Sequence, residues 1–144
     1  MITVQQIFDM AIHLMDEQNE SSGVTQTNDT AEYRFRTISI LNTVMPALYP
    51  YSDTCDTAVQ GRPVCPMLAV NPNDYQNPDF SQQIPLDDTL AASLLPYALA
   101  GHLLSGENES LSLWFLTRYN QAFADLRNKV PAEFQQIHAP YGLF

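Results

Sequence analysis

Residues 86–129 have the sequence LDDTLAASLLPYALAGHLLSGENESLSLWFLTRYNQAFADLRNK, and they hold most of the long apolar runs of the chain. Asp87 or Asp88 can accept hydrogen bonds from the first free N–H groups of a helix. The polar run SGEN in the middle, with its glycine, is typical of a short turn between helices. The stretch therefore predicts two antiparallel helices, at about 87–105 and 110–129.

The first of these two helices is apolar on more than one face. One stripe recurs at three- and four-residue steps, and further leucines widen it around the cylinder. A single neighbour could hardly cover such a surface, so we expect this helix in the middle of a core or at an oligomer interface. The stripe consists of Leu90, Leu94, Tyr97, Ala98 and Gly101, and the added residues are Leu95, Leu99, Leu103 and Leu104.

Two more helices are predicted in the first third of the chain. Thr3 and Gln6 have the spacing of a capping box, which predicts a helix at about 3–18. Polar residues with several potential N-caps precede a second apolar periodic run, which predicts a helix at about 30–48. The sequence thus indicates an all-α fold with four main helices in one domain, residues 1–144, as the length allows.

The remaining segments show no helical period. Residues 49–85 are rich in proline and asparagine and predict a long irregular insertion, of a length that is commonly functional or ordered by a partner. Within it, Thr54–Val59 and Arg62–Val64 could pair as a short β-hairpin. Val130 and Pro131 should end the last helix and begin an extended tail, 130–144.

Composition restricts the function. Sixteen acidic and six basic residues give a net charge of −10, which argues against nucleic-acid binding and suits either plain solubility or a basic protein partner. Cys55 and Cys65 lack the spacing of a zinc site and are expected to be reduced thiols in a cytoplasmic protein. The first residues do not have the pattern of a signal peptide, and no apolar run is long enough to span a membrane.

We find no pattern that indicates an enzyme or a cofactor. His13, His102 and His138 lie on separate elements, and an N-cap explains Asp87 and Asp88 better than a catalytic carboxylate pair does. Nucleophile-elbow, phosphate-loop, dinucleotide-binding and zinc-protease motifs do not occur. The sequence therefore predicts no catalytic, cofactor or metal site.

Contact with a partner or another subunit is the role that we expect for the noteworthy side chains. Basic charge gathers at three arginines, which could instead be solvated surface residues. Aromatic residues of the insertion suggest that it is held on a surface. The aromatic tail would pack in a groove, on its own domain or on a neighbouring subunit. The residues expected at such an interface are Arg34, Arg36, Arg62, Tyr75, Phe80, Phe134, Tyr141 and Phe144.

Five segments, in this order, resemble the small head–tail connector, or adaptor, proteins of tailed bacteriophages, and similar runs occur in phage and prophage proteins of unknown role. The segments are Thr3–Ala11 (TVQQIFDMA), Leu48–Ser52 (LYPYS), Ile84–Asp88 (IPLDD), Leu94–Ala100 (LLPYALA) and Trp114–Tyr119 (WFLTRY). The likeness covers most of the chain except the middle of the insertion.

The resemblance implies a structural protein of the virion, assembled in the cytoplasm of the bacterial host. It would form a homo-oligomeric ring and bind portal and tail proteins. We expect the apolar surfaces of the two helices in 86–129, together with the aromatic tail, to exceed what one copy can bury. The alternative is an acidic regulatory or inhibitory protein that binds a basic protein partner.

Overall fold

A computed structural model of the chain describes residues 1–17, 20–55 and 64–137, and of residues 129–137 only the backbone. Within this part, the chain forms four α-helices and one 3₁₀ turn, which confirms the predicted all-α fold. The elements are α1 (Val4–Met15), α2 (Ala31–Leu48), η1 (Tyr49–Tyr51), α3 (Asp88–Leu103) and α4 (Glu109–Ile137).

The helix starts follow local chemistry. Thr3 and Gln6 form the predicted capping box, in which each side chain bonds to the backbone N–H of the other residue, at 3.3 and 2.9 Å. Asp87 caps α3 by accepting a hydrogen bond from the backbone N–H of Leu90 at 2.8 Å. The other free N–H groups at the start of α1 donate to the insertion, where Val4 N bonds to the carbonyl of Gln82 at 2.9 Å.

Two predicted helix ends are wrong. The first helix was expected to reach residue 18, but α1 ends at Met15 because Asp16 adopts the left-handed conformation, with φ of 59°. The last helix was expected to end near Lys129, but α4 continues to Ile137. Pro131 removes one helical hydrogen bond, and the good helix formers that follow it offset this loss. The extended tail predicted for 130–144 is therefore helical as far as Ile137.

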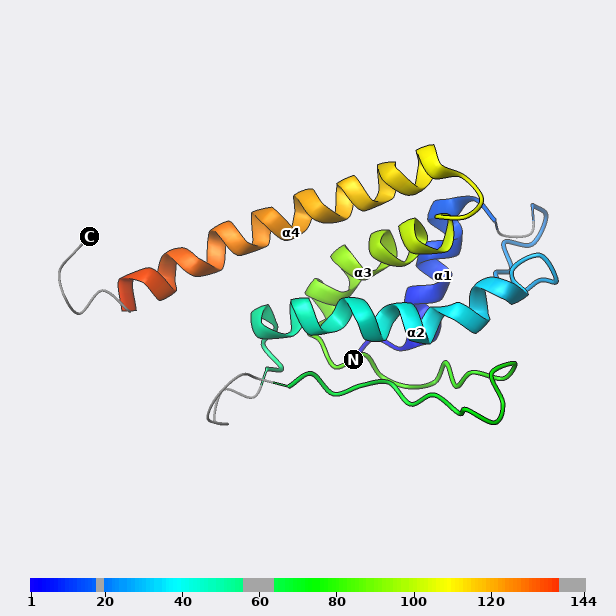
Figure 1. Cartoon of the computed structure of the whole chain (residues 1–144), viewed down its shortest axis with the longest axis horizontal. Coiled ribbons are helices and arrows are strands. Elements are labelled where there is room, and N and C mark those ends of the chain that lie inside the picture. Colours follow the sequence, from blue (N-terminus) through cyan, green and yellow to red (C-terminus); the bar gives the residue numbers. More distant parts are fainter. Residues whose placement is uncertain (18–19, 56–63, 138–144) are drawn as a thin grey trace.

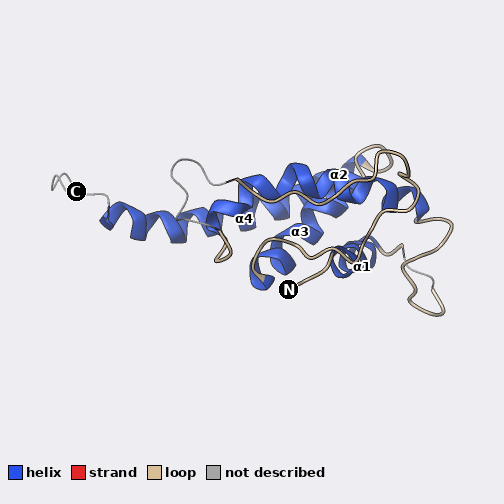
Figure 2. Cartoon of the chain, turned by 90° about the horizontal axis from the view of Figure 1, so that it is seen from below, coloured by secondary structure: helices blue, strands red, loops and turns tan. Residues whose placement is uncertain are grey.

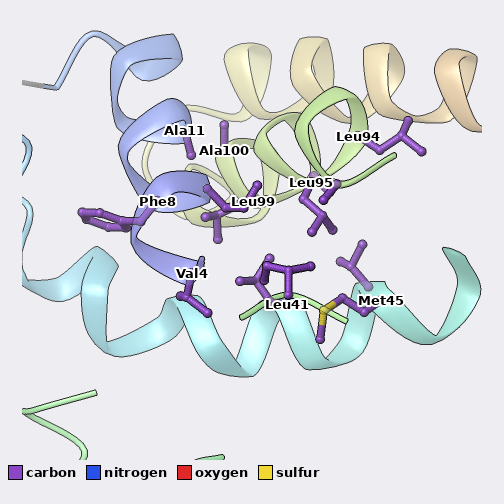
Figure 3. Close-up of a cluster of buried hydrophobic side chains, with 14 of the residues drawn as sticks. Val4, Phe8, Ala11, Leu41, Met45, Leu94, Leu95, Leu99 and Ala100 are labelled. Atoms are coloured by element: carbon purple, nitrogen blue, oxygen red, sulfur yellow. The ribbon is translucent and has the colours of Figure 1, made fainter. Parts of the chain in front are cut away.

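The central helix of the body is α3, which contacts α1, α2 and α4 (Figure 1). Its apolar faces are buried in one copy: Leu95, Leu99 and Leu103 are fully enclosed. Three helices of its own chain surround α3, so of the two expected positions, a core or an oligomer interface, the structure shows a core. The expectation that both helices and the aromatic tail together exceed what one copy can bury stays a prediction, because the side chains of the tail are not described. The side chains that meet in this core, labelled in Figure 3, are Val4, Phe8, Ala11, Leu41, Met45, Leu94, Leu95, Leu99 and Ala100.

Close packing of α3 against α4 depends on a glycine. Gly101 lies so near α4 that a Cβ atom built on it would be 2.6 Å from Leu116 Cγ. The hydroxyl of Ser112, buried between the helices, donates a 2.7 Å hydrogen bond to the carbonyl of Gly101. The small residues of α3 thus let α4 approach its backbone.

The insertion runs back along the outside of the helices (Figures 1 and 2). Its second described part, residues 64–85, passes α2 and then the start of α1, where Thr3 and Gln83 form an isolated antiparallel β-bridge. The β-hairpin predicted at Thr54–Val59 and Arg62–Val64 falls largely on 56–63, outside the described residues.

Candidate interaction surface

A groove of about 260 Å³ lies between α2 and the insertion. Two exposed aromatic side chains line it: Phe35 of α2 is 42 % exposed, and Tyr75 of the insertion is 59 % exposed. Val70 is also exposed there, beside the buried Ile38. Large apolar side chains around a concave surface are typical of sites that bind a ligand or a protein segment.

Side-chain amides hold the insertion in place around this groove. Asn42 of α2 pairs with the backbone of Leu68, accepting from its N–H at 2.8 Å and donating to its carbonyl at 3.1 Å. Gln82 pairs in the same way with the backbone of Ala69, at 2.6 and 3.0 Å. These two pairs satisfy backbone N–H and C=O groups of the insertion, which in a β-sheet would bond to a neighbouring strand. The described part of the insertion is therefore positioned by contacts within its own chain. The sequence had indicated that a segment of this length is commonly either functional or ordered by a partner.

The groove is acidic. Asp74 and Asp79 line it, and none of the described residues around it is basic. Asp74 accepts hydrogen bonds from the side-chain amide of Asn77 at 3.0 and 3.1 Å. Hydrogen bonds from the side chain and backbone of Ser81 lower the pKa of the Asp79 carboxyl. The lowered pKa keeps the Asp79 carboxylate charged at neutral pH, which suits a cationic group.

Arg34 and Phe80 are used inside the fold. The ring of Phe80 is buried and packs against Phe8 of α1, with ring centroids 5.2 Å apart. The guanidinium of Arg34 stacks on Phe80 at 4.3 Å and lies 5.6 Å from Phe8. Burial lowers the pKa of Arg34. The half-buried Arg34 and the buried Phe80 thus join α2, α1 and the insertion within one copy, and their place at an interface stays a prediction.

Arg36 stabilises the C-terminal end of α3. Its guanidinium donates to the carbonyls of His102 at 3.0 Å and Leu103 at 3.3 Å, and it lies 3.6 Å from the carboxylate of Glu32. These carbonyls belong to the last turn of the helix, where a positive charge also interacts favourably with the dipole. Arg36 therefore has a structural role within one copy.

Other predicted interface residues lie where their side chains are not described. Phe134 is on the last part of α4, and Arg62, Tyr141 and Phe144 are outside the described residues. Tyr75 is the predicted residue that the structure places on an exposed concave surface. Sequence analysis missed Phe35, Asp74 and Asp79, because no local signal connects a helix position with a loop 40 residues later.

Aromatic and cationic side chains alternate along α4. The side chain of Trp114 is 47 % exposed, and the guanidinium carbon of Arg118 lies 4.8 Å from the centroid of its ring. About two and a half helical turns later, Arg127 lies 5.0 Å from the centroid of the Phe123 ring, which also contacts Tyr51 edge to face. Such cation–π contacts leave the charge exposed while they cover one face of the ring.

The charge of the chain is distributed unevenly. Residues 1–108 contain 13 acidic and three basic side chains, whereas α4 contains three of each. The net charge of −10 thus lies entirely before α4. Like charge therefore opposes close contact between two such bodies.

Potential metal ligands do not form a cluster in the part of the chain that is described. There, no three His, Cys, Asp or Glu side chains gather to hold a metal ion. His13 contacts the carbonyl of Gly23 at 3.2 Å, and Cys55 and Cys65 are free thiols. Within the same residues, no helix has the length and apolar character that crossing a membrane requires.

No family model matches the chain, and no curated protein or solved structure is significantly similar to it.

Proposed function

We propose that this chain is a structural protein without catalytic activity, which forms a ring in the virion of a tailed bacteriophage and joins the portal to the tail. The resemblance of five segments to connector proteins suggested this role, and one feature of the structure supports it physically. That feature is the part of α4 that extends beyond the rest of the body (Figure 1).

The length of α4 is more than its own domain uses. It has 29 residues against 16 in α3, which it packs along. The 13 additional residues extend the helix by about 20 Å at 1.5 Å per residue. An isolated helix of this length is marginal in water, because helices normally gain their stability from packing. The extension is therefore suited to contact with another protein.

Charge agrees with a role around a DNA channel. A ring whose subunits each carry a net charge of −10 repels the phosphate backbone. The genome would pass through such a ring without being held by electrostatic attraction. Binding to portal and tail proteins would then rely on the exposed apolar and aromatic side chains.

The alternative function, an acidic regulator that binds a basic protein, rests on a separate observation. Four of the six basic residues have described side chains, and each of these is engaged within the chain: Arg34, Arg118 and Arg127 by aromatic rings and Arg36 by carbonyls. Most acidic side chains lack such a partner among the described cations. Salt-sensitive recovery of a basic partner in pull-down experiments would favour this alternative.

Deletion of the gene from the phage or prophage that carries it tests the connector role. We expect lysates with DNA-filled heads and separate tails in electron micrographs, and infectious particles after addition of the purified protein. Normal particles from the deletion strain, or a gene that lies far from capsid and tail genes, would refute the connector role.

A further inference from the structure

The groove between α2 and the insertion holds two carboxylates that form no ion pair with the described side chains of the chain. It lies where the insertion turns beside the first half of α2 (Figure 1). Asp74 and Asp79 line it, and no described basic side chain does. Arg34 and Arg36 flank Phe35 of the groove, but their guanidinium groups lie on aromatic rings and on the last carbonyls of α3. A cationic group from outside the chain would therefore meet a favourable potential here.

Two aromatic rings of the same groove are exposed. Neither Phe35 nor Tyr75 stacks on another ring or on a guanidinium within the part of the chain that is described. Elsewhere in the chain, three arginines do place a guanidinium on an aromatic ring, a contact that is attractive because the face of the ring is electron-rich. These three pairs are Arg34 with Phe80, Arg118 with Trp114, and Arg127 with Phe123.

We propose that the groove binds the side chain of an arginine that a partner protein presents. The guanidinium would lie against the exposed rings of Phe35 and Tyr75 and donate hydrogen bonds to the carboxylates of Asp74 and Asp79. Arginine suits both parts of the site, because its planar group stacks on rings and its N–H donors match the geometry of a carboxylate. This binding site goes beyond the proposed function, since it does not require that the chain form a ring.

Both carboxylates keep acceptor positions free for such a ligand. The side-chain amide of Asn77 donates to the two oxygens of Asp74, and the backbone and hydroxyl of Ser81 donate to one oxygen of Asp79. A carboxylate has about four acceptor positions, so these bonds occupy about half of them. The donors are neutral and hold the carboxylates in place without cancelling their charge.

The size of the groove suits one side chain. Its volume of about 260 Å³ is below the range of about 300–1,000 Å³ for pockets that enclose drug-sized ligands. Val70 and Pro78 also line it, and the methylene stem of an arginine can pack on such apolar residues. Residues on either side of the arginine would cover further apolar surface, which a free guanidinium compound cannot do. A protein segment is therefore the occupant that the groove favours.

Charge favours a different protein over a second copy as the source of the arginine. Two acidic bodies repel each other, whereas a basic segment is attracted. A second copy also has few arginines to offer: four of the five in the chain have described side chains, and each of these is engaged within its own copy. The four are Arg34, Arg36, Arg118 and Arg127.

Short capped peptides and the full chain provide the test. The first peptide has one central arginine between alanines, the second has lysine there, and the third has citrulline, which is a neutral isostere of arginine. Saturation-transfer NMR of each peptide with the full chain measures weak dissociation constants, whether the chain is a monomer or a ring. An ionic strength of about 0.15 M screens attraction between distant charges.

Two pairs of substitutions locate the binding site. The groove variant carries Asp74→Asn and Asp79→Asn, which remove the charges and keep an oxygen for the local hydrogen bonds. The control variant carries Glu20→Gln and Asp53→Asn, which change the net charge equally at two exposed positions outside the groove. Circular dichroism and thermal denaturation show whether each variant folds.

We expect the arginine peptide to bind with a dissociation constant of about 1 mM or lower. The citrulline peptide, and the groove variant with the arginine peptide, should each bind at least about tenfold more weakly, because charge-assisted hydrogen bonds are lost. The control variant should bind the arginine peptide as the wild type does. Arginine should bind about threefold more tightly than lysine, and Phe35→Leu with Tyr75→Leu should remove this preference, because leucine has no aromatic face.

Four outcomes would overturn the proposed site. These are no binding of the arginine peptide at about 10 mM, equal binding of the citrulline peptide, wild-type binding by the groove variant, and an equal loss in the control variant. The gene deletion is read separately. A protein that restores head–tail joining but does not bind the arginine peptide keeps the proposed function and loses this site.

Discussion

Replacement of Gly101 by alanine tests the packing of α3 on α4. The new Cβ atom would lie 2.6 Å from Leu116 Cγ and 2.7 Å from Leu116 Cδ2. Carbon atoms in favourable contact are about 3.5–4.0 Å apart, so one helix or the leucine must move by about 1 Å. Such overpacking costs about 1–3 kcal/mol. The higher helix propensity of alanine returns about 1 kcal/mol, which leaves a net loss of about 1 kcal/mol in the free energy of unfolding.

The cost of Gly101→Ala should fall when the side chain of Leu116 is shortened. In the Leu116→Ala background the atoms at 2.6 and 2.7 Å are absent, and the nearest remaining atom is the backbone nitrogen at 3.3 Å. Gly101→Ala should then destabilise the chain less than it does with Leu116 present, because only the 3.3 Å contact opposes the gain of about 1 kcal/mol from helix propensity. The coupling energy between the two substitutions is the overpacking term, about 1–3 kcal/mol.

Urea denaturation followed by circular dichroism measures these four free energies, provided that unfolding is two-state. Gly106→Ala is the matched control, because a Cβ atom there meets nothing within 4 Å. It should change stability by less than about 0.5 kcal/mol. If Gly101→Ala destabilises the chain equally in both backgrounds, the contact with Leu116 is not the reason for glycine at this position.

Three further substitutions test other contacts. Thr3→Ala removes the N-cap of α1 and should cost about 1 kcal/mol in urea denaturation, while Thr3→Ser should cost little. Arg36→Met removes the hydrogen-bond donor at the end of α3 and should lower the free energy of unfolding by about 1–2 kcal/mol. Glu32→Gln is its control, because it alters only an exposed ion pair. Equal effects of the two substitutions would contradict the role assigned to Arg36. Burial is the main cause that raises the pKa of the Glu17 carboxyl above 4.5, and three neighbouring carboxylates add to it. The contribution of Glu17 to the free energy of unfolding is therefore full below pH 4.5 and is lost as the pH rises through the raised pKa. Glu17→Gln should therefore be more favourable, relative to the wild type, at pH 7 than at pH 4.5, and an equal difference at both values would refute this.

The sequence predicts the helix starts and the core because these depend on neighbouring residues. Helix starts can be predicted from Thr3 with Gln6 and from Asp87, because their capping hydrogen bonds form within one helical turn. The apolar width of α3 correctly indicated a helix with neighbours on several sides. It left open whether those neighbours belong to one copy, and the structure answers that they do.

The groove could not be predicted because distant residues create it. Asn42 looks like an ordinary polar position on α2, and only the folded chain brings it to the backbone of Leu68. The contacts of Arg34 within the fold could not be predicted from the sequence either. Its charge suggested a surface residue, whereas Phe8 and Phe80, which enclose it, come from opposite sides of it in the sequence.

Because α3 is buried within one copy, the contacts of the proposed ring would have to come from other surfaces, such as the extension of α4. A helix extension about 20 Å long and 10 Å wide covers only a few hundred Å², less than the roughly 800 Å² per partner of a stable interface. One such contact is weak. In a closed ring each copy makes two of them, and the final contact forms within the assembly, at a high effective concentration. Rings would thus be favoured over open chains, and a larger partner that gathers several copies would promote their closure.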